Sequence, residues 1–158
     1  MRNRVEVVEA LFGALQQQDI ELAASLLDDQ FELVGLTPGT LQKEQFLALH
    51  SELQAAMPDL SYNLEGVHRQ EDRDHVEGTI QLRGTHTDEL SLPLYTMRSL
   101  PATGIAMALP QTTIHVQVDN DLVVLLRADV IAGGGLNGIL QQLGSELPLL
   151  PRNDRFAE

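Results

Sequence analysis

The strongest structural signal in the chain lies in residues 75–86, which read His-Val-Glu-Gly-Thr-Ile-Gln-Leu-Arg-Gly-Thr-His. Apolar and polar residues alternate along this stretch without a break. One side carries Val76, Ile80 and Leu82, and the final histidine, His86, falls on that same side. A period of two is the period of a β-strand, so the stretch predicts a strand with one apolar and one polar face.

Three further strands are expected around this one. The segment at about 61–69 precedes it, and the polar run 70–74 between them predicts a hairpin turn. Two more segments, at about 111–118 and 122–131, flank a second polar turn. Residues 87–104 connect the two pairs. A connection of that length inside a small domain often forms the wall of a pocket.

The N-terminal part of the chain has a helical period instead. Apolar residues recur every three or four positions over about residues 3–17, and Asp19 is placed to cap a second, shorter helix. A short extended segment at 31–36 precedes a third helix that ends before Pro58. The apolar face of the third helix is formed by Phe46, Leu49, His50, Leu53 and Met57.

This order of elements predicts an α+β fold, in which a curved antiparallel sheet wraps the N-terminal helices as a cone. A chain of 158 residues suffices for one domain. We assign residues 1–144, which end with a short apolar helix at 136–143, to that domain and residues 145–158 to a C-terminal tail. A cone of this kind encloses an interior whose mouth admits a small apolar ligand.

The composition narrows the classes of partner. Asp and Glu number 23 against 10 Lys and Arg, which gives a net charge of −13 and a surface that repels phosphate groups. No nucleic-acid or membrane partner is therefore expected. The chain has no cysteine, which excludes thiolate catalysis and disulfides. Without a membrane-spanning apolar run or a signal peptide, the sequence predicts a soluble, cytoplasmic protein.

Five short strings follow one another along the chain, and they are Gln18-Asp19, Met57-Pro58-Asp59-Leu60, Gly84-Thr85-His86-Thr87, Pro101-Ala102-Thr103-Gly104 and the closing segment from Leu136 to Gly144. In order and spacing they resemble the SnoaL-like polyketide cyclase branch of the nuclear transport factor 2-like superfamily. The resemblance implies a homodimer formed through the sheet. It also implies acid–base chemistry, without metal or other cofactor, on a hydrophobic molecule held in a pocket.

Two residues are the catalytic candidates that the resemblance implies. His86 closes the alternating strand on its apolar side, and an imidazole titrates near neutral pH, which suits proton transfer. Its alternative role is to tie the strand end to the following loop. Asp129 is the carboxylate expected from the last strand, where apolar neighbours would raise its pKa. Arg127 lies two residues earlier on the same face, so a structural ion pair is the alternative for Asp129.

His50, Arg127 and Tyr95 are the candidates for substrate binding. His50 shares the apolar face of the third helix, where it either touches the pocket or serves as a satisfied core histidine. His115 alternates with apolar residues, so it faces away from the core, on the side of the sheet that similar proteins use for dimerisation.

A metal site is not expected. The residues with suitable ligand atoms cluster at the predicted hairpin tip, where a solvated group of charges is the better interpretation. They are His68, Asp72, Asp74 and His75.

Two functions of different classes stay open. The first is a cyclase that uses His86 and Asp129. The second is a non-catalytic module that binds a ligand or another protein, which is favoured if Arg127 neutralises Asp129. An isomerase of the ketosteroid isomerase type ranks below the cyclase. At the positions that resemble that family, Leu11 stands where its tyrosine would fall, and Thr37 precedes Pro38 where its general base would be expected. The aromatic residue that is common near position 127 in the cyclases that the chain resembles is missing, which also favours the non-catalytic module.

Overall fold

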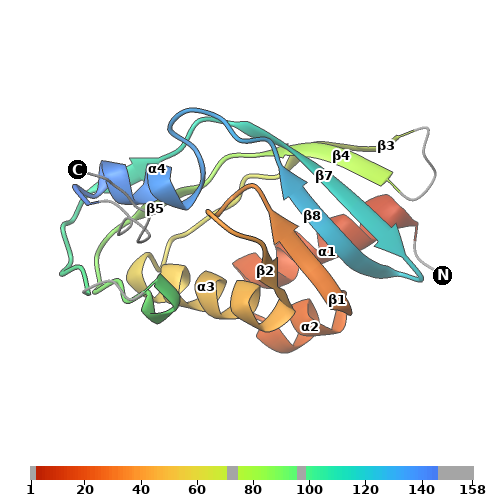
Figure 1. Cartoon of the computed structure of the whole chain (residues 1–158), viewed down its shortest axis with the longest axis horizontal. Helices are drawn as coiled ribbons and strands as arrows, with labels where there is room; N and C mark the ends of the chain where they lie inside the picture. Colours follow the sequence, from red (N-terminus) through yellow and green to blue (C-terminus); the bar gives the residue numbers. More distant parts are fainter. Residues whose placement is uncertain (1–2, 71–74, 96–98, 146–158) are drawn as a thin grey trace, which may run out of the picture.

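The structure is a computed structural model that describes residues 3–70, 75–95 and 99–145. A strongly curved sheet covers a layer of helices, and a fourth helix closes the open end (Figure 1). The predicted α+β cone is confirmed. The predicted tail falls almost wholly outside the described residues, as does most of the predicted hairpin tip at 70–74.

The main sheet has six strands in the order β2-β1-β8-β7-β4-β3. Neighbouring strands are antiparallel except β1 and β8, which are parallel. The fully antiparallel sheet predicted from the sequence is wrong for this one pair. Parallel neighbours need a long connection, and most of the chain separates these two strands. The strands are β1 Leu27–Val34, β2 Leu41–Gln42, β3 Glu65–Arg69, β4 His75–Ile80, β7 Thr112–Asp119 and β8 Leu122–Ala128.

The alternating stretch 75–86 keeps its period but forms two strands rather than one. Burial alternates at every position from Val76 to His86, with the apolar side inward. After β4, however, the chain changes partner, and β5 (Arg83–Thr85) pairs with β6 (Ala106–Ala108) in a separate small sheet. The pairing register shifts by one residue across Pro110, which has no N–H to donate to a strand ladder.

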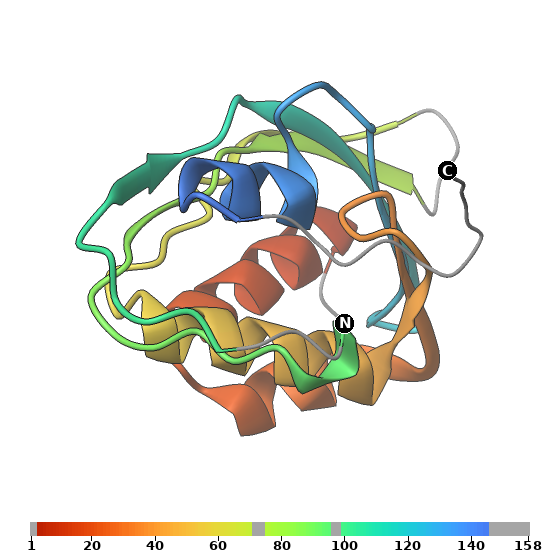
Figure 2. The ribbon, with the colours of Figure 1, turned by 60° about the vertical axis from the view of Figure 1, so that its left-hand side comes forward.

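The helices pack inside the curve of the sheet (Figure 2). The N-cap predicted at Asp19 is confirmed, because its Oδ1 accepts a hydrogen bond from the Leu22 amide at 3.1 Å. The second helix ends at Ser25, and β1 starts at Leu27, earlier than the extended segment predicted at 31–36. The helices are α1 Arg4–Gln16, α2 Ile20–Ser25, α3 Lys43–Ala56 and α4 Gly135–Gln142, with one 3-10 turn, η1 Pro93–Tyr95.

The described part of the long connection 87–104 packs against the rest of the domain. Leu90 and Leu92 are almost fully buried, and Leu90 pairs with Leu100 through two backbone hydrogen bonds. Residues 96–98 lie outside the described part. Within the residues that the structure describes, no helix combines the length and the apolar character needed to cross a lipid bilayer.

Candidate functional site

A small apolar cavity lies between α3, the inner face of β1 and α4. Its free volume is about 40 Å³, whereas pockets that hold drug-sized ligands measure roughly 300–1,000 Å³. Helix α3 supplies four side chains at helical spacing, and α4 closes the opposite wall. The lining residues are Leu33, Leu36, Thr37, Phe46, Leu49, His50, Leu53, Tyr62, Leu82, Gly135, Leu136 and Ile139.

His50 and Tyr62 are polar residues in this otherwise mostly apolar lining. The His50 Nδ1 atom lies 2.6 Å from the Tyr62 hydroxyl, and its Nε2 atom lies 3.0 Å from the Leu15 carbonyl oxygen. The two rings stack with centroids 5.6 Å apart, and Phe12 packs edge-on against Tyr62. Both polar side chains are almost completely buried. Every nitrogen of this imidazole therefore has a partner inside the protein.

Burial governs the protonation of the pair. It lowers the pKa of His50, although the hydrogen bond to the Leu15 carbonyl acts in the opposite direction. Burial also raises the pKa of the Tyr62 hydroxyl. Both shifts favour the neutral forms, so the pair holds an uncharged imidazole against an uncharged phenol.

A larger open cleft adjoins the cavity. It has a volume of about 420 Å³ and is bounded by the β1–β2 connection on one side and by the glycine run 133–135 and the start of α4 on the other. The wall between the two spaces is thin, because four residues line both: Leu36, Thr37, Gly135 and Leu136.

Glycine is required where α4 meets this wall. The Leu136 amide donates to the Leu36 carbonyl at 2.8 Å, which draws the two segments together. A Cβ atom on Gly135 would lie 2.8 Å from the Leu36 oxygen, and its φ of +67° lies in the left-handed region. At Gly138 a Cβ atom would meet the Gly133 carbonyl oxygen. Gly135 and Gly138, both within α4, therefore allow the close docking of this helix.

His86 is fully buried but is absent from the lining of the cavity. Its Nδ1 atom lies 2.9 Å from the Thr103 hydroxyl and accepts the Thr103 amide at 3.3 Å. Since Nδ1 accepts, Nε2 carries the proton, and this buried N–H has no hydrogen-bond partner among the residues that the structure describes. The structure thus places His86 in its alternative role, as a tie between β5 and the loop. A catalytic role stays a prediction.

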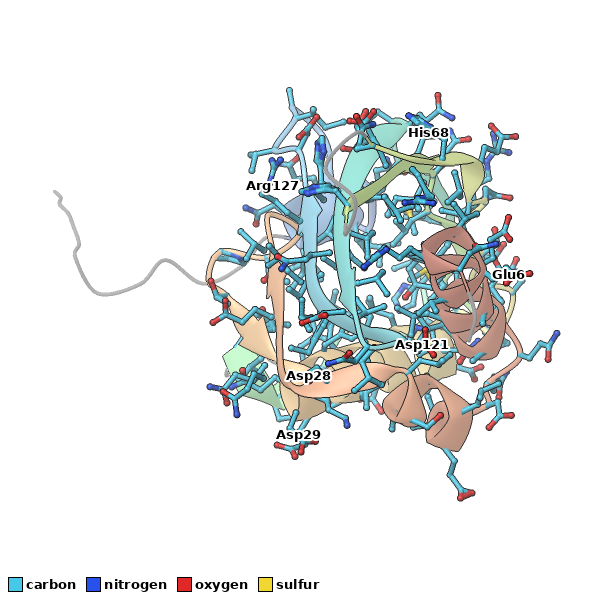
Figure 3. The ribbon with its side chains drawn as sticks, turned by 90° about the vertical axis from the view of Figure 1, so that its right-hand side faces the viewer. Glu6, Asp28, Asp29, His68, Asp121 and Arg127 are labelled. Carbon is cyan, nitrogen blue, oxygen red and sulfur yellow. The ribbon has the colours of Figure 1, made fainter. Side chains whose placement is uncertain are left out.

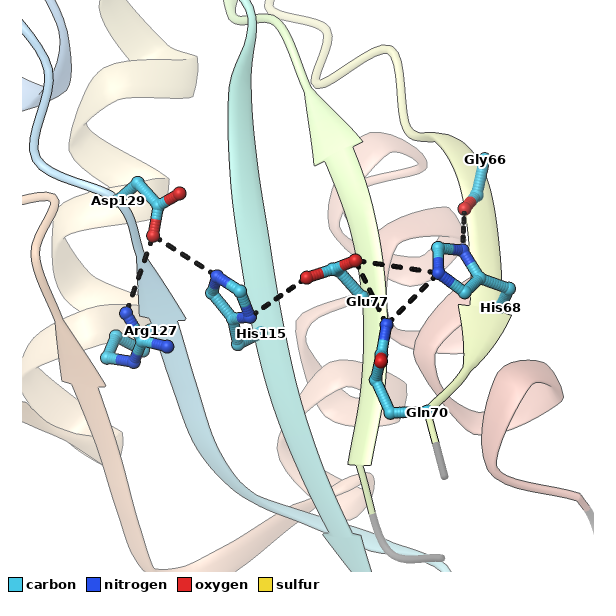
Figure 4. Close-up of polar contacts among 7 residues, drawn as sticks. All are labelled: Gly66, His68, Gln70, Glu77, His115, Arg127 and Asp129. Atoms are coloured by element: carbon cyan, nitrogen blue, oxygen red, sulfur yellow. Dashed lines mark hydrogen bonds and ion pairs between the residues drawn. The ribbon is translucent and has the colours of Figure 1, made fainter. Parts of the chain in front are cut away.

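Asp129 and Arg127 lie on the outer face of the sheet, away from the cavity. Asp129 follows β8 and pairs with Arg127 at 3.4 Å and with His115 at 3.1 Å (Figure 4). The predicted position of Asp129 in an apolar pocket is wrong, because the period of two that buries Ala128 turns its neighbours outward. The ion pair with Arg127, the alternative drawn from the sequence, is present.

The outer-face network continues beyond Asp129. The second nitrogen of His115 lies 3.3 Å from Glu77, whose other oxygen is 3.5 Å from His68. His115 therefore faces outward, as its alternation predicts. Arg127 and His68, at the two ends of this network, lie to the left and to the right of β7 in Figure 3. The homodimer expected through this face stays a prediction.

Of the five predicted site residues, only His50 lines the cavity. Tyr95, at the end of η1, is half-buried, and its side chain hydrogen-bonds to Thr37, which is itself a lining residue. Burial raises the pKa of the Tyr95 hydroxyl. Tyr62 was not among the predicted residues. The sequence contains only a weak signal for Tyr62: it is one of two tyrosines in the chain, and it follows the turn after α3.

The interpretation of the hairpin-tip residues as a solvated group of charges stays a prediction. No group of three or more potential ligand side chains is found among those residues. Asp72 and Asp74, which belonged to that set, lie outside them.

Comparison with known proteins finds likeness in structure alone, since no family model and no curated protein matches the sequence. IdmH of Streptomyces antibioticus, a candidate polyketide cyclase, superposes with a TM-score of 0.67 at 19% identity over 90% of this chain and 99% of its own. A candidate SnoaL-like polyketide cyclase from Jannaschia gives 0.63 at 19% identity, over 79% of this chain and 83% of that one. A nuclear transport factor 2-like protein from Burkholderia thailandensis gives 0.61 at 16% identity, over 81% and 90%.

These likenesses establish the fold. The chain has the nuclear transport factor 2-like fold, in agreement with the resemblance drawn from its five strings, and similar structures include candidate polyketide cyclases. Identities this low carry no reaction from one protein to the other, because this fold supports unrelated functions on different sites.

Proposed function

We propose that this protein is a ligand-binding module that holds a small hydrophobic molecule in the cavity between α3, β1 and α4. The observation that carries the proposal is the lining of that cavity, which is apolar except for Thr37 and the His50–Tyr62 pair. A few polar groups at one end of an apolar cavity fix the orientation of a ligand without supplying charge.

Cyclisation through His86 and Asp129 is the second candidate, supported by the polyketide cyclases among the similar structures. It requires both groups at one substrate. Asp129 is paired with Arg127 on the outer face, and His86 is engaged with Thr103, so both would have to be rearranged. The binding module needs no such change and is therefore preferred.

Entry of a ligand requires the cavity to widen. The thin wall formed by Leu36 and Leu136 separates it from the open cleft of about 420 Å³. A displacement of α4 at this wall would join the two spaces. We therefore expect slender molecules, which can pass between two leucine side chains, to bind better than fused ring systems.

The test is a titration of the protein, labelled with ¹³C at its leucine methyl groups, with 1-hexanol, hexanal and toluene. We expect the methyl signals of Leu33, Leu49 and Leu136 to shift in a saturable way. The variant Ile139→Trp, which fills the cavity from α4, should lose binding. Leu22→Trp, on the partly exposed face of α2, should keep it.

Two further variants separate the candidates. His86→Ala and Asp129→Asn should leave the affinity for these probes unchanged, because neither residue lines the cavity. If none of the three probes shifts the cavity methyl signals, or if Ile139→Trp binds as well as the wild type, the proposal is wrong.

A further inference from the structure

We infer that the cavity selects an apolar molecule that carries a hydroxyl group, an alcohol or a phenol, over a carbonyl compound of the same shape. The hydroxyl would donate a hydrogen bond to the oxygen of Tyr62. This inference rests on the proposed binding function and names the chemical class of its ligand.

The contacts of the His50 ring show which of its two nitrogens carries the proton. The Leu15 carbonyl oxygen has no proton to donate, so the Nε2 atom, 3.0 Å away, must carry one. In the neutral ring Nδ1 is then the acceptor. The contact of 2.6 Å between Nδ1 and Tyr62 is consequently a hydrogen bond donated by the Tyr62 hydroxyl.

The protons of His50 and Tyr62 are already engaged, which limits the hydrogen bonds that the pair can form with a ligand. The single proton of Tyr62 is held by His50, and the single proton of His50 is held by Leu15. A phenolic oxygen that donates its proton retains the capacity to accept. The pair thus presents an acceptor to the cavity and no donor.

Among the described residues, no other side chain of the lining offers a free hydrogen-bond donor. Besides His50 and Tyr62, only Thr37 among the described residues of the lining has a polar side chain. Its hydroxyl donates to the Gly39 carbonyl at 2.6 Å, so this proton is committed as well. Among these side chains a ligand carbonyl would therefore find no donor, whereas a ligand hydroxyl would find an acceptor.

The same arrangement disfavours an anionic ligand. A carboxylate needs several donors when it is removed from water, and none of the three polar lining side chains has a free one. The hydroxyl end of the ligand would lie against Tyr62, and its apolar chain would extend along the leucines toward the wall at Leu36 and Leu136.

The experiment compares 1-hexanol with hexanal, which have the same chain length and nearly the same shape. Dissociation constants come from the leucine methyl titration described above. We expect 1-hexanol to bind about 3- to 10-fold more tightly, the ratio that corresponds to one net hydrogen bond. Hexanoate should show no saturable shift.

Variants of the His50–Tyr62 pair test whether this pair causes the difference in affinity between 1-hexanol and hexanal. Tyr62→Phe alone would leave the His50 Nδ1 atom as a substitute acceptor, so the double variant His50→Leu/Tyr62→Phe is needed. It should bind both probes with a ratio near one, while His115→Leu, which changes the imidazole on the outer face, should keep the wild-type ratio.

Each outcome has a distinct meaning. Equal affinity for the two probes in the wild-type protein overturns the hydroxyl preference and leaves the binding function standing. Failure of both probes to bind overturns the preference together with the binding function. The wild-type comparison is decisive even if the double variant does not fold.

Discussion

Two histidines, one on each side of the sheet, use both ring nitrogens but meet opposite kinds of partner. His50, inside, lies between a phenol and a backbone carbonyl and is almost completely buried. His115, outside, lies between the carboxylates of Glu77 and Asp129 and is partly exposed. The inner ring satisfies both partners as a neutral molecule. The outer ring donates to both carboxylates only when it carries two protons.

Burial and partner charge, more than residue type, decide what each histidine contributes to stability. Inside, loss of a single partner leaves a buried polar atom without water to replace it. Outside, solvent takes over from any partner that is removed. The expected effects of substitution therefore differ in size between the two sites.

The largest effect is expected for Tyr62→Ala. The variant removes a buried ring that packs on Phe12 and His50, and it leaves the His50 Nδ1 atom without its donor. We expect a loss of about 3–5 kcal/mol in the free energy of unfolding, as for other buried aromatic residues. Urea unfolding followed by circular dichroism measures it.

Tyr62→Phe is the matched control, because it keeps the ring and deletes only the hydroxyl. We expect a loss of about 1–3 kcal/mol, the cost of one unsatisfied buried acceptor. If Tyr62→Phe were as stable as the wild type, the inner pair would not be the tightly coupled unit described above.

A smaller effect is expected from pH. The lowered pKa of His50 means that below about pH 6.5 the unfolded chain binds a proton that the folded protein does not. Stability from this group is therefore complete above pH 6.5 and declines as the pH falls toward the lowered pKa. An NMR titration of the His50 ring should give a midpoint below 6.5, and a midpoint at or above that value would contradict the neutral inner ring.

The smallest effect is expected on the outer face. Glu77→Gln removes the carboxylate between His115 and His68, both partly exposed. We expect a change below about 1 kcal/mol, reduced further by added salt. Urea unfolding at low and high salt provides the measurement. A loss above 2 kcal/mol would show that the outer network is as tightly coupled as the inner pair.

The distribution of the acidic residues follows the pattern expected from the sequence. No Asp or Glu is among the buried polar residues in the part of the chain that the structure describes. Glu6 and Asp29 lie at the periphery of the molecule (Figure 3). The net charge thus belongs to the exterior and leaves the cavity uncharged.

Local features were readable from the sequence because they depend on near neighbours. The alternation in 75–86 showed which side chains are buried, and the helical period placed His50 on the inner face of α3. The break between β4 and β5 was not readable, since it depends on Pro110 in a distant segment opposite the strand.

The amino-acid sequence by itself determined the α+β order, the inward face of each main element, the cap at Asp19 and the acidic exterior. Only the tertiary structure decided which polar groups meet. Tyr62 reaches His50 from the connection between α3 and β3, and Leu15 supplies a carbonyl from α1. The contact between Asp129 and His115 on the outer face was likewise decided by the tertiary structure. Periodicity fixes the face on which a side chain lies, but the partner depends on how the sheet curves and where the helices dock on it.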